Sequence, residues 1–269
     1  MEYQDVRVET RGASSWIYLN RPEQMNAIRP QTHPELIHAF EQADADPETS
    51  FIVFTGAGRG FCAGDDFQEI FFSEDGPGKR SEASLNRYRT RHGAATPLLD
   101  IIMRCTKPTI AAVNGAAVGI GMDLALLCDM RVAGEGAKMG SFFVRRGVVG
   151  TGAGTWLLPR MIGVSRAMEL LLSGELLDAA ACERLSLVSR VVPDADLEDA
   201  VMELIEKLSW GAPLAQRAIK RCVQRGLESS FDDTEEYGRL LSDELWRTDD
   251  HMEGVMSHVE KRKPSYKGS

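Results

Sequence analysis

Three short apolar runs, each ending at a glycine, most constrain how this chain can fold. They are FIVFTGAG at 51–58, KPTIAAVNG at 107–115 and DMRVAG at 129–134. Continuous apolar runs of this length are typical of strands that are buried on both faces of a parallel sheet and deliver a loop where they end. Because apolar residues at helical spacing lie between these runs, we predict βαβ units in an α/β fold.

The two ends of the chain have different patterns. Residues 5–20 alternate around RGAS, which predicts a hairpin, and 30–44 has helical spacing. After about residue 193 the strand patterns stop, and we predict helices over 195–209, 213–227, 231–247 and 249–262. The sequence thus predicts an α/β core over 1–193 and a helical region over 194–269, packed on the core or on a neighbouring subunit. The polar, Gly- and Ser-rich stretch 72–86 predicts a lid or surface loop.

Composition narrows the class of partner and the compartment. The net charge of −9 argues against a nucleic-acid partner. The five cysteines show no metal-ligand spacing, so we expect no metal and free thiols in a reducing compartment. No run reaches the length of a membrane span, and the first residues resemble no targeting segment. We therefore expect a cytoplasmic protein without a membrane partner.

Two glycine-containing loops carry the first chemical signal. RGFCAGDDFQEI at 59–70 and NGAAVGIGMD at 114–123 each follow a strand and lead into a helix. Helix N-termini present unpaired N–H donors and a positive dipole end. Either loop alone is more often only a tight turn. Side by side at the ends of adjacent strands, they could form a two-donor oxyanion hole that polarises a thioester or another acyl carbonyl.

Several longer motifs, in this order, resemble the crotonase superfamily, the enoyl-CoA hydratase/isomerase family. They are NRPEQMNAI at 20–28, FTGAGRGFCAGDDFQEI at 54–70, KPTIAAVNGAAVGIGMDLALLCD at 107–129, the run from 157 to 193, and HVEKRKPSYKG at 258–268. The resemblance covers nearly the whole chain. It implies an α/β fold of the ClpP/crotonase type, a spiral of ββα units whose helical C-terminal region forms trimers or dimers of trimers. It also implies an acyl-CoA thioester substrate, with coenzyme A as part of the substrate and no prosthetic group.

The resemblance also implies the site residues. By motif, the amides of Ala63 and Ile120 would bind the thioester oxygen, and Asp123 would be the acid or base. The residues expected to bind the coenzyme A part are Gln24, Asn26, Ala27, Ala63, Gly64, Asp65, Asp66 and Lys261. Those expected to form the acyl pocket are Phe67, Phe142, Phe143, Arg146 and Thr151.

The expected acids depart from the family pattern. Family hydratases use two glutamates, whose positions fall here on Asp123, a shorter acid, and on Phe143. No acid occurs from Lys138 to Met168. A hydratase needs one group to activate water and another to handle the α-proton, and phenylalanine can do neither. Asp65, Asp66 or Glu69 could approach from the first loop, and Asp123 could instead cap a helix or pair with an arginine.

Three functions remain open from the sequence. The first is hydration or isomerisation of an acyl-CoA; a single acid suits isomerisation, because one base can remove and return a proton beside a stabilised enolate. The second is a crotonase-fold acyl-CoA hydrolase or C–C lyase. The third is a non-catalytic acyl-CoA-binding protein. The aromatic residues at 142–143 suggest a bulky or cyclic acyl group, although core packing would explain them as well.

Overall fold

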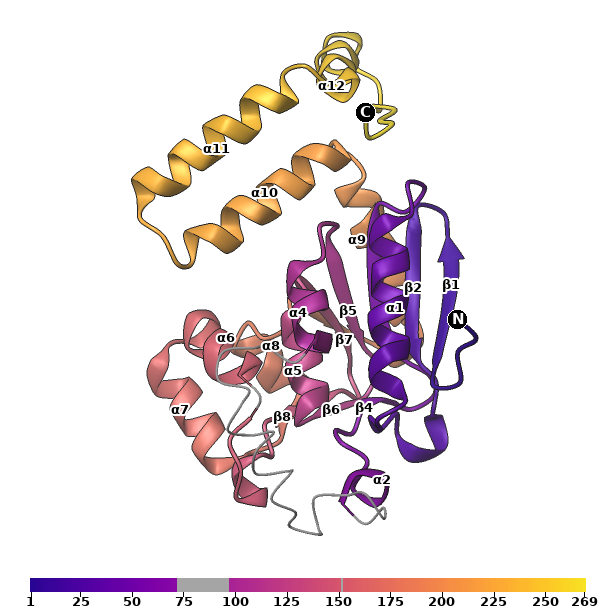
Figure 1. Cartoon of the computed structure of the whole chain (residues 1–269), viewed down its shortest axis with the longest axis vertical. Coiled ribbons are helices and arrows are strands. Elements are labelled where there is room, and N and C mark those ends of the chain that lie inside the picture. The colour runs from indigo at the N-terminus through magenta and orange to yellow at the C-terminus, as the bar shows by residue number, and fades with distance from the viewer. Residues whose placement is uncertain (72–96, 151) are drawn as a thin grey trace.

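A computed structural model describes residues 1–71, 97–150 and 152–269 (Figure 1). The predicted lid at 72–86 and the pocket residue Thr151 lie outside the described residues.

The larger of two sheets has six strands in the order β1-β2-β3-β5-β7-β10. Their bounds are Val6–Arg11, Ser14–Leu19, Phe51–Gly56, Thr109–Val113, Met130–Gly134 and Arg190–Val192. The hairpin β1–β2 is antiparallel, and every other neighbouring pair is parallel. The hairpin and the three buried parallel strands predicted from the apolar runs are therefore confirmed.

A second, smaller sheet lies beside the first and was not predicted. Its order is β4-β6-β8-β9, with bounds Gly60–Cys62, Ala116–Val118, Lys138–Gly140 and Leu177–Asp178. The first three strands run parallel, and β9 is antiparallel to β8. Each of these strands has at most three residues, which is too short for a periodic pattern to identify.

Helices surround the sheets and continue beyond them. Those that pack on the α/β core are α1 (Thr32–Ala45), α4 (Pro97–Arg104), α5 (Ile120–Leu127), α6 (Ala153–Ile162), α7 (Val164–Ser173), α8 (Ala179–Arg184) and α9 (Leu197–Leu208), and the short helix α2 (Phe67–Phe71) follows β4. They are followed by α10 (Pro213–Gly226), α11 (Phe231–Leu245) and α12 (Asp249–Glu260). The described residues also form three short 3₁₀ helices, η1 (Pro22–Gln24), η2 (Val144–Arg146) and η3 (Asp194–Asp196).

Alternation along the strands builds two apolar layers on the large sheet. Ile17 and Leu19 of β2 face the main core, which includes α1, α4, α5 and the second sheet. Trp16 and Tyr18 face the opposite side, where Leu197, Val201 and other residues of α9 cover them. Because α9 begins just after residue 193 and still packs on the sheet, the division between 1–193 and 194–269 stays a prediction.

The last three helices extend away from the core at one end of the molecule, while α2, β4 and β6 lie at the opposite end (Figure 1). All five cysteines are free thiols, and four of them are buried. Across the described ranges, no helix combines the length and the apolar character that a membrane crossing requires.

Two asparagines hold the loop between β3 and β4. The Asn26 side chain donates to the carbonyls of Ala57 and Gly60, at 2.9 and 2.7 Å. The Asn114 side chain donates to the carbonyls of Gly56 and Gly58, at 2.8 and 2.9 Å. Buried carbonyls need such partners, and a side-chain amide can satisfy two of them at once. These bonds fix where β4 begins and so set the position of the loop that follows it.

Candidate active site

A cavity of about 630 Å³ lies where the three parallel strands of the second sheet end. The loops after β4 and β6 and the segment after β8 supply its lining, which consists of Ala63, Gly64, Asp65, Phe67, Val118, Gly119, Ile120, Phe142, Phe143, Arg146 and Val148. Its volume is within the range of small-molecule sites. The carboxyl ends of parallel strands are also where ligands bind in open α/β sheets.

The two loops of the cavity pack backbone against backbone. Gly64 has a φ of +103°, which favours glycine, and a Cβ there would lie 3.0 Å from the Val118 carbonyl oxygen. A Cβ on Gly121, in the first turn of α5, would lie 2.2 Å from the Cys62 carbonyl oxygen. The glycines singled out in the sequence therefore allow the close approach of the two loops.

The main-chain amides correct one expectation. The amide of Ala63 donates to the Met25 carbonyl at 3.0 Å, so the prediction that it is an oxyanion donor is wrong: its single N–H is already used. The amides of Asp65 and Ile120 donate no hydrogen bond to any part of the chain that the structure describes. Because both residues line the cavity, their amides are available as donors to a bound carbonyl.

Ile120 fits its place despite its branched side chain. It is the first residue of α5, where a backbone amide has no partner within the helix. Its side chain is buried in the main core, which leaves the amide at the cavity. A β-branched residue therefore keeps the donor available here.

Asp123 is turned toward α6. Its side chain is 1% exposed, and among its interactions Oδ1 accepts the Gly154 amide at 3.0 Å, in the first turn of α6. A carboxylate at a helix N-terminus is stabilised by the unpaired amides and the dipole. Asp123 is not among the described residues that line the cavity. Its role as the acid or base stays a prediction, and capping of a helix explains its burial.

The acyl end of the cavity is aromatic. Phe67, Phe142, Phe143 and Arg146 all line it, as predicted for a pocket. The Arg146 guanidinium lies 4.8 Å from the centre of the Phe67 ring, and that of Arg145 lies 5.0 Å from the Phe142 ring. Within the described ranges, neither arginine takes part in an ion pair.

A comparison with known proteins decides the family. The model of the family described as "Enoyl-CoA hydratase/isomerase" matches residues 9–269. The chain belongs to the enoyl-CoA hydratase/isomerase family.

Relatives of known name and structure support this membership. The chain is 34% identical to a 1,2-epoxyphenylacetyl-CoA isomerase of Escherichia coli K12, over 93% of each chain. It is 34% identical to an (E)-benzylidenesuccinyl-CoA hydratase of Thauera aromatica, over 98% of this chain and 99% of the relative. The crystal structure of an enoyl-CoA hydratase from Bacillus anthracis superposes with a TM-score of 0.89 at 30% identity, over 99% and 100% of the chains. The predicted crotonase-type fold is thereby confirmed.

The residues expected to bind coenzyme A in this family member are not all brought together. Ala63, Gly64 and Asp65 line the cavity, whereas Gln24, Asn26, Ala27 and Asp66 do not. Asn26 is 1% exposed, and its side chain accepts the Arg21 amide and donates to the carbonyls of Ala57 and Gly60. The Asp66 carboxylate pairs with Arg21 at 3.0 Å. Asn26 and Asp66 therefore support the loops of the site through bonds within the protein. Contacts of Gln24, Asn26, Ala27 and Asp66 with coenzyme A stay predictions.

Lys261 lies far along the chain from these loops. It follows α12 directly, with a φ of 54°, and α12 is at the end of the molecule opposite to β4 and β6 (Figure 1). One chain alone therefore does not bring Lys261 to its own cavity.

Sequence reasoning missed three residues of the lining, Val118, Gly119 and Val148. It also missed that Met25 takes up the Ala63 amide. The apolar residues follow short strands that left no periodic signal. The pairing of residues 25–28 with 63–66 joins segments almost forty residues apart, and no local pattern reports it.

Proposed function

We propose that this family member isomerises the double bond of an enoyl-CoA thioester through an enolate, and that it does not hydrate it. Phe143 carries the proposal: it stands at the position of the second family glutamate, and its ring lines the cavity. An apolar ring cannot activate water, whereas isomerisation needs only one group that removes a proton and returns it. The amides of Asp65 and Ile120 would bind the thioester oxygen and stabilise the enolate.

The apolar cavity supports a bulky acyl group. Phe67, Phe142 and Phe143 line it together with the aliphatic residues Ala63, Val118, Ile120 and Val148. Two relatives have names that include a phenyl-bearing acyl group, a phenylacetyl-CoA isomerase and a benzylidenesuccinyl-CoA hydratase. Aromatic side chains bind rings in offset or edge-to-face arrangements. We propose an aromatic or cyclic acyl chain, with coenzyme A as part of the substrate and no prosthetic group.

The expected result is conversion of a 3-enoyl-CoA with a terminal phenyl group into its conjugated 2-enoyl isomer. The rise of the conjugated-enoyl absorbance measures it. Hydration of crotonyl-CoA is followed as loss of that absorbance. It should be about 10²–10⁴-fold slower than in a hydratase with both acids, because one acid–base partner contributes a factor of that size. Efficient hydration would contradict the proposal, as would release of free coenzyme A, which indicates a hydrolase. Tight binding without any turnover would indicate a binding protein.

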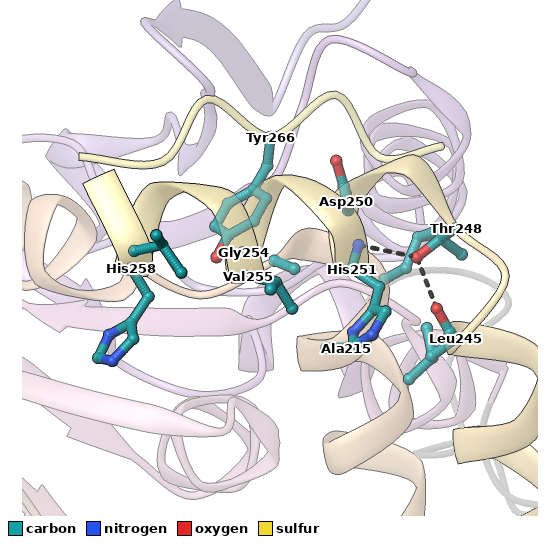
Figure 2. Close-up of a pocket in the computed structure, with 12 residues that line it drawn as sticks. Ala215, Leu245, Thr248, Asp250, His251, Gly254, Val255, His258 and Tyr266 are labelled. Carbon is teal, nitrogen blue, oxygen red and sulfur yellow. Dashed lines mark hydrogen bonds between the residues drawn. The ribbon is translucent and has the colours of Figure 1, made fainter. Parts of the chain in front are cut away.

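We also propose that the chain assembles into trimers or dimers of trimers through α10–α12. Large apolar side chains are exposed along these helices, including Ile219, Val223, Leu227, Phe231, Leu240, Trp246, Met252, Val255, Met256 and Val259. A groove of about 520 Å³ lies among the same helices. Figure 2 shows that Leu245 and Val255 line it, and that Thr248 caps α12 by accepting the His251 amide at 3.1 Å. Monomers rarely expose apolar patches of this extent.

Assembly would also explain Lys261. Lys261 directly follows α12 and cannot reach the cavity of its own chain. In an assembly it can approach the coenzyme A bound to another copy. Five free thiols in such an assembly fit a reducing compartment, in line with the cytoplasmic location that we propose.

Analytical ultracentrifugation should give a mass three or six times the chain mass of 29.6 kDa. The double variant Ile219→Glu/Val223→Glu should sediment as a monomer, because two charges in an apolar interface lose their hydration. Val8→Glu, at an exposed apolar position on the edge strand β1, is the matched control and should keep the assembly. A monomeric wild-type protein would rule the assembly out.

A further inference from the structure

One carboxylate stands apart in the cavity. Of the described residues that line it, Asp65 is the only acid and Arg146 the only base. The Asp65 carboxylate has neither a hydrogen bond nor an ion pair with any described residue, unlike three other acids near the site. Asp5 is paired with Arg29, Asp66 with Arg21, and Asp123 accepts the Gly154 amide. A half-buried acid without a partner costs stability, so such groups are often functional.

The backbone of Asp65 is firmly held although its side chain is not. The Ile28 amide donates to the Gly64 carbonyl at 2.8 Å, and the Asp66 amide donates to the Ile28 carbonyl at 2.7 Å. These two bonds flank Asp65 and fix the direction of its amide. The same residue thereby offers an oxyanion donor and a carboxylate to one cavity.

Burial also adjusts the acidity of this group. Loss of solvent raises the pKa of Asp65 above its ordinary value. A carboxylate with a raised pKa is a better base toward carbon, because the ideal catalytic pKa lies near the working pH. The ionisable groups close to it in the described chain are the buried Cys62 thiol, Asp66 with Arg21, and Arg146 across the cavity.

We infer that Asp65, and not Asp123, is the catalytic residue that transfers the proton in this site, an inference that rests on the proposed isomerisation. In a 3-enoyl-CoA the Asp65 carboxylate takes a proton from C2. The electrons of that C–H bond form a C1–C2 double bond, and the thioester C=O electrons move to the oxygen, which the amides of Asp65 and Ile120 hold. The neutral acid then returns the proton to C4. The C3–C4 double bond shifts to C2–C3, the C=O bond re-forms, and nothing is consumed.

Exchange of C2 hydrogen tests this step without requiring isomerisation. Hexanoyl-CoA is incubated with the protein in D₂O, and uptake of deuterium at C2 is followed by mass spectrometry. Asp65→Asn should slow the exchange by about 10²–10⁴, the contribution of a general base, while the affinity for hexanoyl-CoA is retained. In the wild-type protein the rate should fall on the acid side as Asp65 takes up its proton, and the variant should lack that limb.

Two further variants test whether the effect on exchange is specific to the carboxylate of Asp65. Each removes one negative charge at another position. Glu69→Gln removes a charge from an exposed position on α2, outside the cavity lining, and should exchange like the wild-type protein. Asp123→Asn tests the alternative base: if Asp65 transfers the proton, this variant keeps the exchange and its pH profile. Loss of exchange in a folded Asp123→Asn protein, with exchange retained in Asp65→Asn, would overturn the inference.

Stability separates a catalytic from a structural role. An acid whose pKa is raised on folding binds its proton more tightly in the native state, so it lowers stability as the pH rises through that raised pKa. Above that raised pKa the penalty is complete, and there Asp65→Asn should raise the melting temperature or leave it unchanged. A less stable variant would show that the carboxylate has a structural partner, which overturns the inference.

The outcomes for the inference and for the proposed function can be told apart. Asp65-dependent exchange without isomerisation rejects the proposed reaction and supports the role of Asp65. Isomerisation that survives in Asp65→Asn supports the proposed reaction and rejects the role of Asp65. A wild-type protein that neither exchanges nor isomerises overturns both.

Discussion

Replacing Gly121 with alanine is expected to reduce the rate of C2 exchange by at least about 10²-fold, because the new methyl group drives the two oxyanion loops apart. A Cβ at this position would lie 2.2 Å from the Cys62 carbonyl oxygen and 2.9 Å from its carbonyl carbon. Both atoms belong to the backbone of β4, which cannot rotate away as a side chain would. A displacement of about 1 Å in a catalytic group costs about 10²-fold, and loss of one oxyanion donor costs 10²–10³-fold.

The same change should also lower the free energy of unfolding by about 1–3 kcal/mol, the usual cost of overpacking. Urea unfolding at one fixed protein concentration measures it, since assembly would add to the apparent stability. Gly238→Ala is the control: it lies within α11, and the nearest atom to its Cβ would be the Cys222 Sγ at 3.9 Å. That variant should be neutral or more stable by about 0.4–1 kcal/mol. Wild-type exchange in Gly121→Ala would show that the close approach of the loops is not needed.

Replacing Lys220 with methionine is the second change for which we expect a large effect, here on stability. Lys220 is 8% exposed, and its Nζ lies 2.7 Å from Asp129 Oδ2 and donates to the Lys107 carbonyl at 2.9 Å. Asp129 also accepts the amide and hydroxyl of Thr109, where β5 begins. The lysine therefore fastens α10 to the sheet, and its loss leaves a partly buried carboxylate without its cation.

Removing one partner of a buried pair costs about 3–5 kcal/mol, and we expect about 3 kcal/mol because 25% of the Asp129 side chain is exposed. Urea unfolding measures the loss. The double variant with Asp129→Asn should lose less than the sum of the single variants, since the unpaired charge is gone. Arg104→Met breaks an exposed i,i+4 pair with Asp100 and should leave the free energy of unfolding nearly unchanged. Equal losses in Lys220→Met and Arg104→Met would contradict the structural role assigned to Lys220.

Local patterns were a good guide to the long elements. The apolar runs at 51–58, 107–115 and 129–134 became β3, β5 and β7, because a strand buried on both faces must be apolar at every position. The C-terminal helices began and ended within a few residues of their predicted bounds. The second sheet was missed although it carries the site, because strands of two or three residues are stabilised by their neighbours and not by their own pattern.

The errors at the site have one physical cause. The motif pointed to Ala63, but the amide that faces the cavity is two residues further on, because the Met25 carbonyl takes the Ala63 amide and Ile28 pairs on either side of Asp65. Asp123 was correctly read as an acid in the first turn of a helix. Its surroundings depend on Gly154, thirty-one residues later, which the local pattern does not report.

What the sequence determined by itself is therefore the set of parts: buried parallel strands, glycines that permit close approach, the family, and the loss of a glutamate at Phe143. These follow from side-chain volume, polarity and backbone freedom, which are properties of the residues. The tertiary structure alone decided which amides are unpaired and which carboxylate reaches the cavity. Hydrogen-bond partners and burial are properties of pairs of segments, and these segments meet only when the chain is folded.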